Sequence, residues 1–82
     1  MSEVMDMKEL LTYIVANLVS EPDAISITES AEGDEVTFSL HVAPDDMGRV
    51  IGRHGRIAKE IRTLMKAAGN RENKKVSVDI CD

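Results

Sequence analysis

Two segments of the chain repeat apolar residues at the spacing of an α-helix. The first predicts a helix over about residues 4–19, and its apolar face is formed by Met7, Leu10, Leu11, Ile14 and Leu18. Pro22 lacks an amide donor, so we expect it to prevent continuation of that helix. The second segment predicts a helix from about Arg56, with the apolar face Ile57, Ile61, Leu64, Met65 and Ala68. We expect Gly69 to end this helix in the left-handed conformation.

Three other segments have the pattern of β-strands. A first strand is predicted over about residues 24–30, followed by a polar connection over 31–34. The second strand, over 36–42, alternates apolar and polar residues, which predicts one buried face and ends at Pro44. The last strand has the inward residues Val76, Val78 and Ile80. A polar loop over 70–73 precedes it.

A short helix over about 45–52 completes the predicted elements. Asp45 and Asp46 have the chemistry of helix N-caps, and we interpret them as structural. The predicted order is helix, strand, strand, helix, helix, strand. This order favours an α+β fold in which a three-stranded sheet carries three helices on one face. With 82 residues, we expect one domain over 1–82 with its core over about 4–81.

The charge of the chain is divided between its two parts. The net charge is −5, but residues 1–48 carry eleven acidic and one basic side chain, whereas residues 49–82 carry four acidic and nine basic ones. Electrostatic effects are screened beyond about 8 to 10 Å at physiological salt, so a polyanion would respond to the local charge. The basic segment can therefore bind a polyanion although the whole chain is acidic.

The basic segment contains a short loop with two glycines, Gly52 and Gly55, around Arg53 and His54. Glycine permits positive φ angles and close approach of a ligand. The loop leads into the predicted helix at Arg56, whose free amides and positive dipole end favour an anion such as phosphate. Further donors nearby in sequence are Arg49, Arg56, Lys59 and Arg62. The alternative is a helix-turn-helix connection that needs glycine for its geometry and carries solvated charges.

The segment Val50-Ile51-Gly52-Arg53-His54-Gly55, followed by Ile61, resembles the KH-domain signature Val-Ile-Gly-x-x-Gly-x-x-Ile. The sequence departs from it at Ala58, where the signature has its last isoleucine, and Ile57 is a candidate for that packing role. The predicted order of elements is similar to the type II KH arrangement. Chain length and the sequence from Gly55 to Thr63 resemble the stand-alone bacterial KH proteins of the KhpA family.

The resemblance implies a protein that binds single-stranded RNA. In that family mechanism the glycine loop clamps the backbone of about four nucleotides and the bases lie against an apolar groove. The clamp would be formed by Gly52, Arg53, His54 and Gly55, with support from Arg56 and Lys59 and with Arg49 nearby. Val50 and Ile51 are candidates for the groove or, alternatively, for the core. Neither Phe38, which faces inward, nor Tyr13 offers a stacking platform, so we expect modest affinity.

The resemblance also implies an RNA chaperone or post-transcriptional regulator that forms homodimers, pairs with KhpB (a larger KH-containing protein also called Jag or EloR), or does both. Its family links are to cell-envelope homeostasis and cell length. The alternative is a protein-interaction or dimerisation module with incidental RNA contact. A surface of that kind has no need for Arg53, Arg56 and Lys59 around paired glycines.

Other function classes find little support in the sequence. No nucleophile is patterned around His54, so we expect no enzyme and no small-molecule substrate. His41, His54 and Cys81 lack the spacing of metal ligands, and we expect no metal or cofactor. The single cysteine excludes an intramolecular disulfide. The longest apolar run is far shorter than a membrane span, and no secretory signal is evident, so we expect a cytoplasmic protein.

Overall fold

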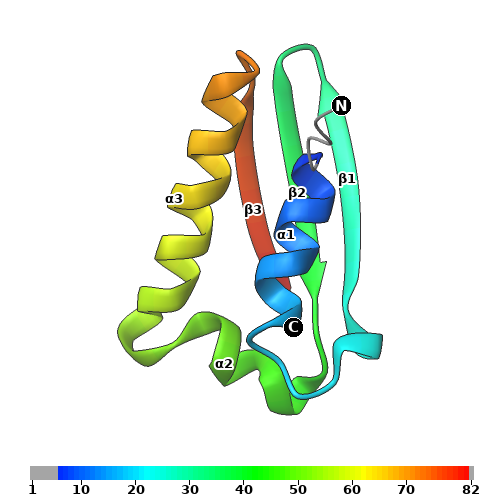
Figure 1. The fold of residues 1–82 in the computed structure, drawn as a ribbon, viewed down its shortest axis with the longest axis vertical. Helices are drawn as coiled ribbons and strands as arrows, with labels where there is room; N and C mark the ends of the chain where they lie inside the picture. Colours follow the sequence, from blue (N-terminus) through cyan, green and yellow to red (C-terminus); the bar gives the residue numbers. More distant parts are fainter. Residues whose placement is uncertain (1–5, 82) are drawn as a thin grey trace, which may run out of the picture.

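The computed structural model describes residues 6–81, and in it three strands form one mixed sheet (Figure 1). The strands are β1 (Ser26–Glu32), β2 (Glu35–His41) and β3 (Lys75–Cys81). β1 pairs antiparallel with β2, and β2 pairs parallel with β3, which gives the order β1-β2-β3. Parallel neighbours require a crossover connection, and the two helices between β2 and β3 provide it.

The helices are α1 (Met7–Ala16), α2 (Met47–Ile51) and α3 (Arg56–Arg71). Short 3₁₀ turns occupy Pro22–Ala24, Pro44–Asp46 and Arg53–Gly55. In Figure 1, α1 and α3 cover the same face of the sheet, and α2 lies at its lower end. The predicted α+β class and the predicted order of helices and strands are confirmed.

The core lies between the sheet and the two longer helices. The alternation in β2 is confirmed, because Val36, Phe38 and Leu40 are buried whereas the residues between them are more exposed. From the helices, the side chains with less than 3% of their surface exposed are Leu11, Val15, Val50, Ile61 and Met65. Burial of such side chains contributes roughly 1.5 to 3 kcal/mol each.

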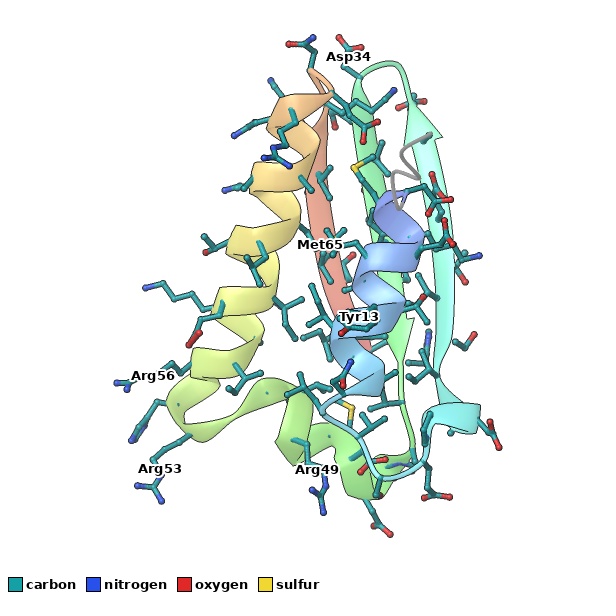
Figure 2. The ribbon with its side chains drawn as sticks, viewed as in Figure 1. Tyr13, Asp34, Arg49, Arg53, Arg56 and Met65 are labelled. Atoms are coloured by element: carbon teal, nitrogen blue, oxygen red, sulfur yellow. The ribbon has the colours of Figure 1, made fainter. Side chains whose placement is uncertain are left out.

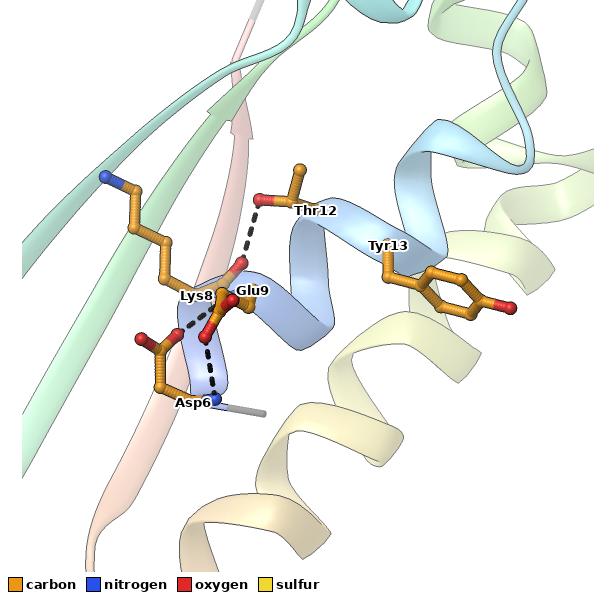
Figure 3. A pocket seen from close by; sticks show the side chains of 5 residues that line it. All are labelled: Asp6, Lys8, Glu9, Thr12 and Tyr13. Carbon is orange, nitrogen blue, oxygen red and sulfur yellow. Dashed lines mark hydrogen bonds between the residues drawn. The ribbon is translucent and has the colours of Figure 1, made fainter. Parts of the chain in front are cut away.

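α1 is shorter than predicted. Asp6 caps it: the Glu9 amide donates to Asp6 Oδ1 at 2.8 Å, and the Asp6 amide donates to Glu9 Oε1 at 3.3 Å (Figure 3). The predicted start at residue 4 lies outside the described residues. The helix ends at Ala16 and not at residue 19, because the amides of Leu18 and Val19 both donate to the Val15 carbonyl and close the chain into a turn.

The hairpin between β1 and β2 is tighter than the predicted four-residue connection. β1 begins two residues later than expected and continues through Glu32, which pairs with Glu35. Only Gly33 and Asp34 form the turn, and Gly33 has a φ of 61°. A two-residue hairpin turn requires such a positive φ angle. The composition of the connection does not specify this turn length.

The prediction that Gly69 ends α3 in the left-handed conformation is wrong. Gly69 is buried inside the helix, which continues to Arg71, and the residue with positive φ is Asn73 (59°). A Cβ on Gly69 would collide with the Val76 side chain and lie 2.9 Å from the Lys74 carbonyl oxygen. Gly69 is needed because the returning chain packs closely against the helix.

Candidate functional site

The loop between α2 and α3 has an unusual backbone. Three of its residues have positive φ angles: Gly52 at 75°, His54 at 58° and Gly55 at 73°. The loop is held by hydrogen bonds from the Gly52 amide to the Gly48 carbonyl at 2.9 Å and from the Gly55 amide to the Gly52 carbonyl at 3.2 Å. Positive φ is uncommon for a residue other than glycine, although histidine adopts it more often than most. The sequence prediction did not include this conformation for His54.

The two glycines of the loop meet different surroundings. Gly52 combines its φ of 75° with a ψ of 176°, a region that is essentially restricted to glycine, and a Cβ there would collide with the Ile57 side chain. Gly55 has the left-handed helical angles 73° and 14°, and no atom lies within 4 Å of the position of its missing Cβ. Gly52 is therefore required by packing, whereas Gly55 leaves open space beside the loop.

The loop leads directly into the first turn of α3. Gly55 is the N-cap residue of this helix and provides no side chain to accept hydrogen bonds from the first amides. No acidic residue lies in the first turn of the helix either. The Arg56 amide donates to the Arg53 carbonyl, but the amides that follow it in the first turn have no acceptor within α3, and the positive end of the helix dipole adds attraction for an anion.

Exposed side chains with nitrogen donors surround the same place. Arg53, His54, Arg56 and Lys59 are all exposed, and Figure 2 shows Arg53 and Arg56 extending away from the body of the protein. Within residues 6–81, the one ion pair joins Arg49 Nε to Asp46 Oδ1 at 3.2 Å, so these four side chains have no carboxylate partner there. The structure thus gathers the predicted clamp residues and their two supporting residues at one corner.

Asp46 braces the segment that leads to the loop. It is fully buried, and its carboxylate accepts hydrogen bonds from the Ser20 amide (3.0 Å), the Ser20 hydroxyl (2.9 Å) and the Glu21 amide (3.1 Å). The Ser20 amide contributes most to lowering the pKa of Asp46 below 3.8, and burial opposes this effect. Asp46 has a structural role, but its side chain holds Ser20 and Glu21 in the connection after α1 and does not cap the amides of α2. Asp45 is exposed.

Two other predicted site residues, Val50 and Ile51, differ in burial. Val50 has no exposed surface and packs in the core, so the core alternative holds and a ligand cannot reach it in this conformation. Ile51 is 37% exposed beside the loop and remains accessible. The difference follows from the helical rotation of about 100° per residue, which turns neighbouring side chains to different sides of α2.

The sequence did not predict a cavity between α3 and the free edge of β3. This cavity of about 230 Å³ is lined by Arg62, Lys66, Val76, Ser77 and Val78. The Arg62 Nε donates to the Val78 carbonyl at 3.1 Å, which directs this arginine to the strand edge. A neighbouring hollow of about 360 Å³ shares Lys66, Val76 and Ser77. Locating either one requires the parallel pairing of β3, which no local sequence signal specifies.

Another hollow, of about 380 Å³, lies on the outer side of α1 between Asp6 and Tyr13 (Figure 3). Its polar groups are largely engaged within the helix, because Asp6 and Glu9 form the cap and the Thr12 hydroxyl donates to the Lys8 carbonyl at 2.8 Å. Tyr13 is 61% exposed there. Lys8 is the one cationic side chain that lines this hollow, and it lies beside the acidic Asp6 and Glu9, so the hollow lacks the cluster of cations found at the loop.

The sequence profile of the family described as KhpA/KhpB, KH domain, matches residues 8–80. The chain belongs to this KH-domain family. The family is non-enzymatic. At the position where the chain departs from the signature, Ala58 is buried and the half-buried Ile57 packs against Gly52 and the core.

Several curated relatives are similar over most of their length. An "RNA-binding protein KhpA" from Clostridium perfringens is 49% identical over 74 residues, which cover 90% of this chain and 99% of the relative. One from Listeria monocytogenes is 45% identical over 76 residues, covering 93% and 100%. One from Chlamydia trachomatis is 42% identical over 76 residues, covering 93% and 97%. No solved structure gave a significant match.

No group of three or more His, Cys, Asp or Glu side chains among residues 6–81 has the arrangement of a metal site. None of the helices formed by these residues has the length and apolar character needed to span a bilayer.

Proposed function

We propose that this KH domain binds single-stranded RNA and that the loop from Gly52 to Gly55 clamps the RNA backbone. The observation that carries the proposal is the loop itself: three residues with positive φ lead into the open N-terminus of α3. In KH domains, such a loop holds the backbone of about four nucleotides. The names of the KhpA relatives support RNA as the ligand.

Each part of the loop has a chemical role in this proposal. The first-turn amides of α3 that follow Arg56 donate hydrogen bonds to a phosphate, and Arg53 and Arg56 add charged donors from either side of Gly55. Lys59, one helical turn further along, contributes to the positive potential. His54 contributes its ring and the left-handed backbone that keeps the loop compact. Arg49 is a weaker candidate, because its Nε is engaged with Asp46.

The bases then lie beside Ile51 and along the cavity between α3 and β3. This cavity presents apolar atoms from Val76 and Val78 together with the polar ends of Arg62 and Lys66. No aromatic side chain lines it, so base stacking contributes little and the affinity for a short RNA is modest. In the cell, the protein acts as a cytoplasmic RNA chaperone or post-transcriptional regulator, with the family links to cell-envelope homeostasis and cell length.

Fluorescence anisotropy with a mixed-sequence single-stranded RNA tests the clamp. The wild type is compared with an Arg53→Asp, His54→Asp double variant at low and physiological salt. Each phosphate neutralised by the wild type contributes a slope of about −0.7 in log affinity against log salt, and the double variant loses binding and this slope. Equal binding by both proteins, with circular dichroism showing both folded, would refute the clamp.

A matched control separates the loop from net charge. The Lys8→Asp, Ser30→Asp double variant makes the same change in formal charge at exposed positions in the first turn of α1 and the second half of β1. Those parts of the two elements lie away from the loop in Figure 1. The control variant retains most of the RNA affinity if the local charge decides binding.

A second candidate function is assembly with another KH-containing protein. Two large apolar side chains are exposed on the helical side of the molecule, Tyr13 (61%) on α1 and Leu64 (53%) on α3. Such a surface suits a second copy of this chain or KhpB, the Jag/EloR-type partner that family resemblance implies. Size-exclusion chromatography with light scattering tests this, because Leu64→Glu abolishes a dimer formed through that surface and leaves RNA binding by the monomer intact.

A further inference from the structure

The cavity between α3 and β3 contains a hydrogen bond that changes what the strand edge offers to a ligand. Among residues 6–81, β3 has a neighbouring strand only on its β2 side. The Val78 carbonyl, which accepts from the Arg62 Nε at 3.1 Å, therefore points away from the sheet and toward the cavity. An intramolecular donor thus occupies a main-chain acceptor at the middle of this edge.

The charged groups that remain beside that carbonyl are hydrogen-bond donors, and the Ser77 hydroxyl, which also lines the cavity, both donates and accepts. A residue in a parallel strand directs its N–H and its C=O to the same side, so the Val78 amide also faces the cavity. Arg62 uses Nε for the carbonyl and retains the N–H groups on its two Nη atoms, for which no acceptor is found among residues 6–81. Lys66 adds an ammonium group, which only donates.

This arrangement discriminates between the two chemical kinds of nucleobase. Guanine and uracil carry a keto oxygen at the position where adenine and cytosine carry an exocyclic amine. A keto oxygen accepts from the guanidinium, whereas an amine at the same place meets these donors, and one of the two acceptor positions of the Val78 carbonyl is already taken by Arg62. A site built to hydrogen-bond one group rejects an analogue whose polar atoms it leaves unpaired.

We propose that Arg62 makes this cavity select keto bases over amino bases in single-stranded RNA. The inference rests on the proposed RNA-binding function and adds a specificity-determining residue to it. Arg62 lies six residues after Arg56 on the same helix, a rise of about 9 Å. A strand whose backbone is held at the loop can therefore place a nearby base against Arg62.

Oligouridine and oligocytidine of equal length provide the sharpest test, because their pyrimidine rings differ at the keto or amino position. Fluorescence anisotropy with the wild type is expected to give roughly tenfold tighter binding of oligouridine, the lower part of the range for a specific base contact. Equal affinity for the two oligomers, together with binding of mixed-sequence RNA, overturns the inference and leaves the proposed function standing. Failure to bind any RNA overturns both.

Two variants assign the preference to Arg62. Arg62→Met keeps the apolar stem but frees the Val78 carbonyl, so the preference for oligouridine is expected to disappear or reverse. Lys66→Met removes a charge from the same cavity without freeing that carbonyl, so it is expected to weaken the binding of both oligomers and to keep most of the preference for oligouridine. A folded Arg62→Met protein that keeps the wild-type ratio overturns the role of Arg62.

Arg62→Lys is the second variant in case the methionine variant does not fold. It preserves the positive charge but loses the planar fork of donors, so a reduced preference with nearly unchanged overall affinity supports the inference. A wild-type ratio in this folded variant would show that charge alone accounts for the preference, and the inference would fail.

Discussion

The two turns that flank α3 both depend on glycine, but for opposite physical reasons. The turn before the helix contains Gly55, whose missing side chain leaves open space at the surface. The turn after the helix depends on Gly69, whose missing side chain lets Val76 and the Lys74 carbonyl approach the helix backbone. Gly52 combines both demands, because it has a positive φ and also contacts Ile57. Glycine alone therefore does not distinguish a binding loop from a packing contact.

Gly52→Ala is expected to have the largest effect. Its backbone angles cost about 1 to 3 kcal/mol for a residue with a Cβ, and overpacking against Ile57 adds about 1 to 3 kcal/mol. The total is a large share of the roughly 4 to 12 kcal/mol of stability expected for 82 residues. Urea unfolding of the variant and the wild type measures this loss of stability. A loss below about 1 kcal/mol would show that the loop relaxes around the new methyl group.

Gly69→Ala is expected to destabilise the protein by about 1 to 2 kcal/mol, because overpacking against β3 exceeds the gain of about 1 kcal/mol in helix propensity. The melting temperature is expected to fall by roughly 4 to 16 °C. RNA affinity of the folded variant stays at the wild-type value, because this turn lies at the other end of α3 from the loop (Figure 1). A stabilised variant would contradict the close-packing explanation.

Gly55→Asp is expected to cost only about 1 kcal/mol of stability, because aspartate tolerates the left-handed conformation and the space is open. Its RNA affinity is expected to fall tenfold or more, since a carboxylate then lies where the proposed phosphate binds. Gly55→Asn is the matched control, with a similar size and no charge, and it separates repulsion from obstruction. Equal RNA affinity for Gly55→Asp and the wild type would contradict the clamp.

The smallest expected effect is the pH dependence that Asp46, which supports the chain before the loop, gives to the free energy of unfolding. Its pKa is lowered in the folded state, so its stabilising contribution is complete above pH 3.8 and declines below it, where the unfolded chain takes up the proton first. The decline ends once the pH passes the lower pKa of the folded state. Urea unfolding across this range should give a flatter pH profile for Asp46→Asn, and parallel profiles would contradict it.

The parts of the structure that the sequence predicted are those with strong local signals. Alternation in β2 placed Phe38 in the core, and the spacing of Gly52 and Gly55 predicted the loop, because both patterns are confined to a few consecutive residues. The single turn of α2 is too short for periodicity to separate Val50 from Ile51. Local patterns therefore predict these elements, but they do not predict contacts between distant segments.

The missed features depend on residues that are distant in the sequence. Asp46 was interpreted as a helix cap because its neighbours suggested one, yet its partners are Ser20 and Glu21 in another segment. Arg62 was counted among the cations near the loop, but its hydrogen bond goes to Val78. The end of α3 was misplaced at Gly69 because only the returning β3 explains that glycine.

The strand order also turns the uneven charge along the chain into a charge separation across the molecule. β1, with Glu29 and Glu32, forms one edge of the sheet, whereas α3, with Arg56, Lys59 and Lys66, packs beside the opposite edge (Figure 1). The protein is therefore an electric dipole that lies across its strands. An approaching polyanion exerts a torque that rotates α3 toward it before contact, and added salt slows association by removing this alignment.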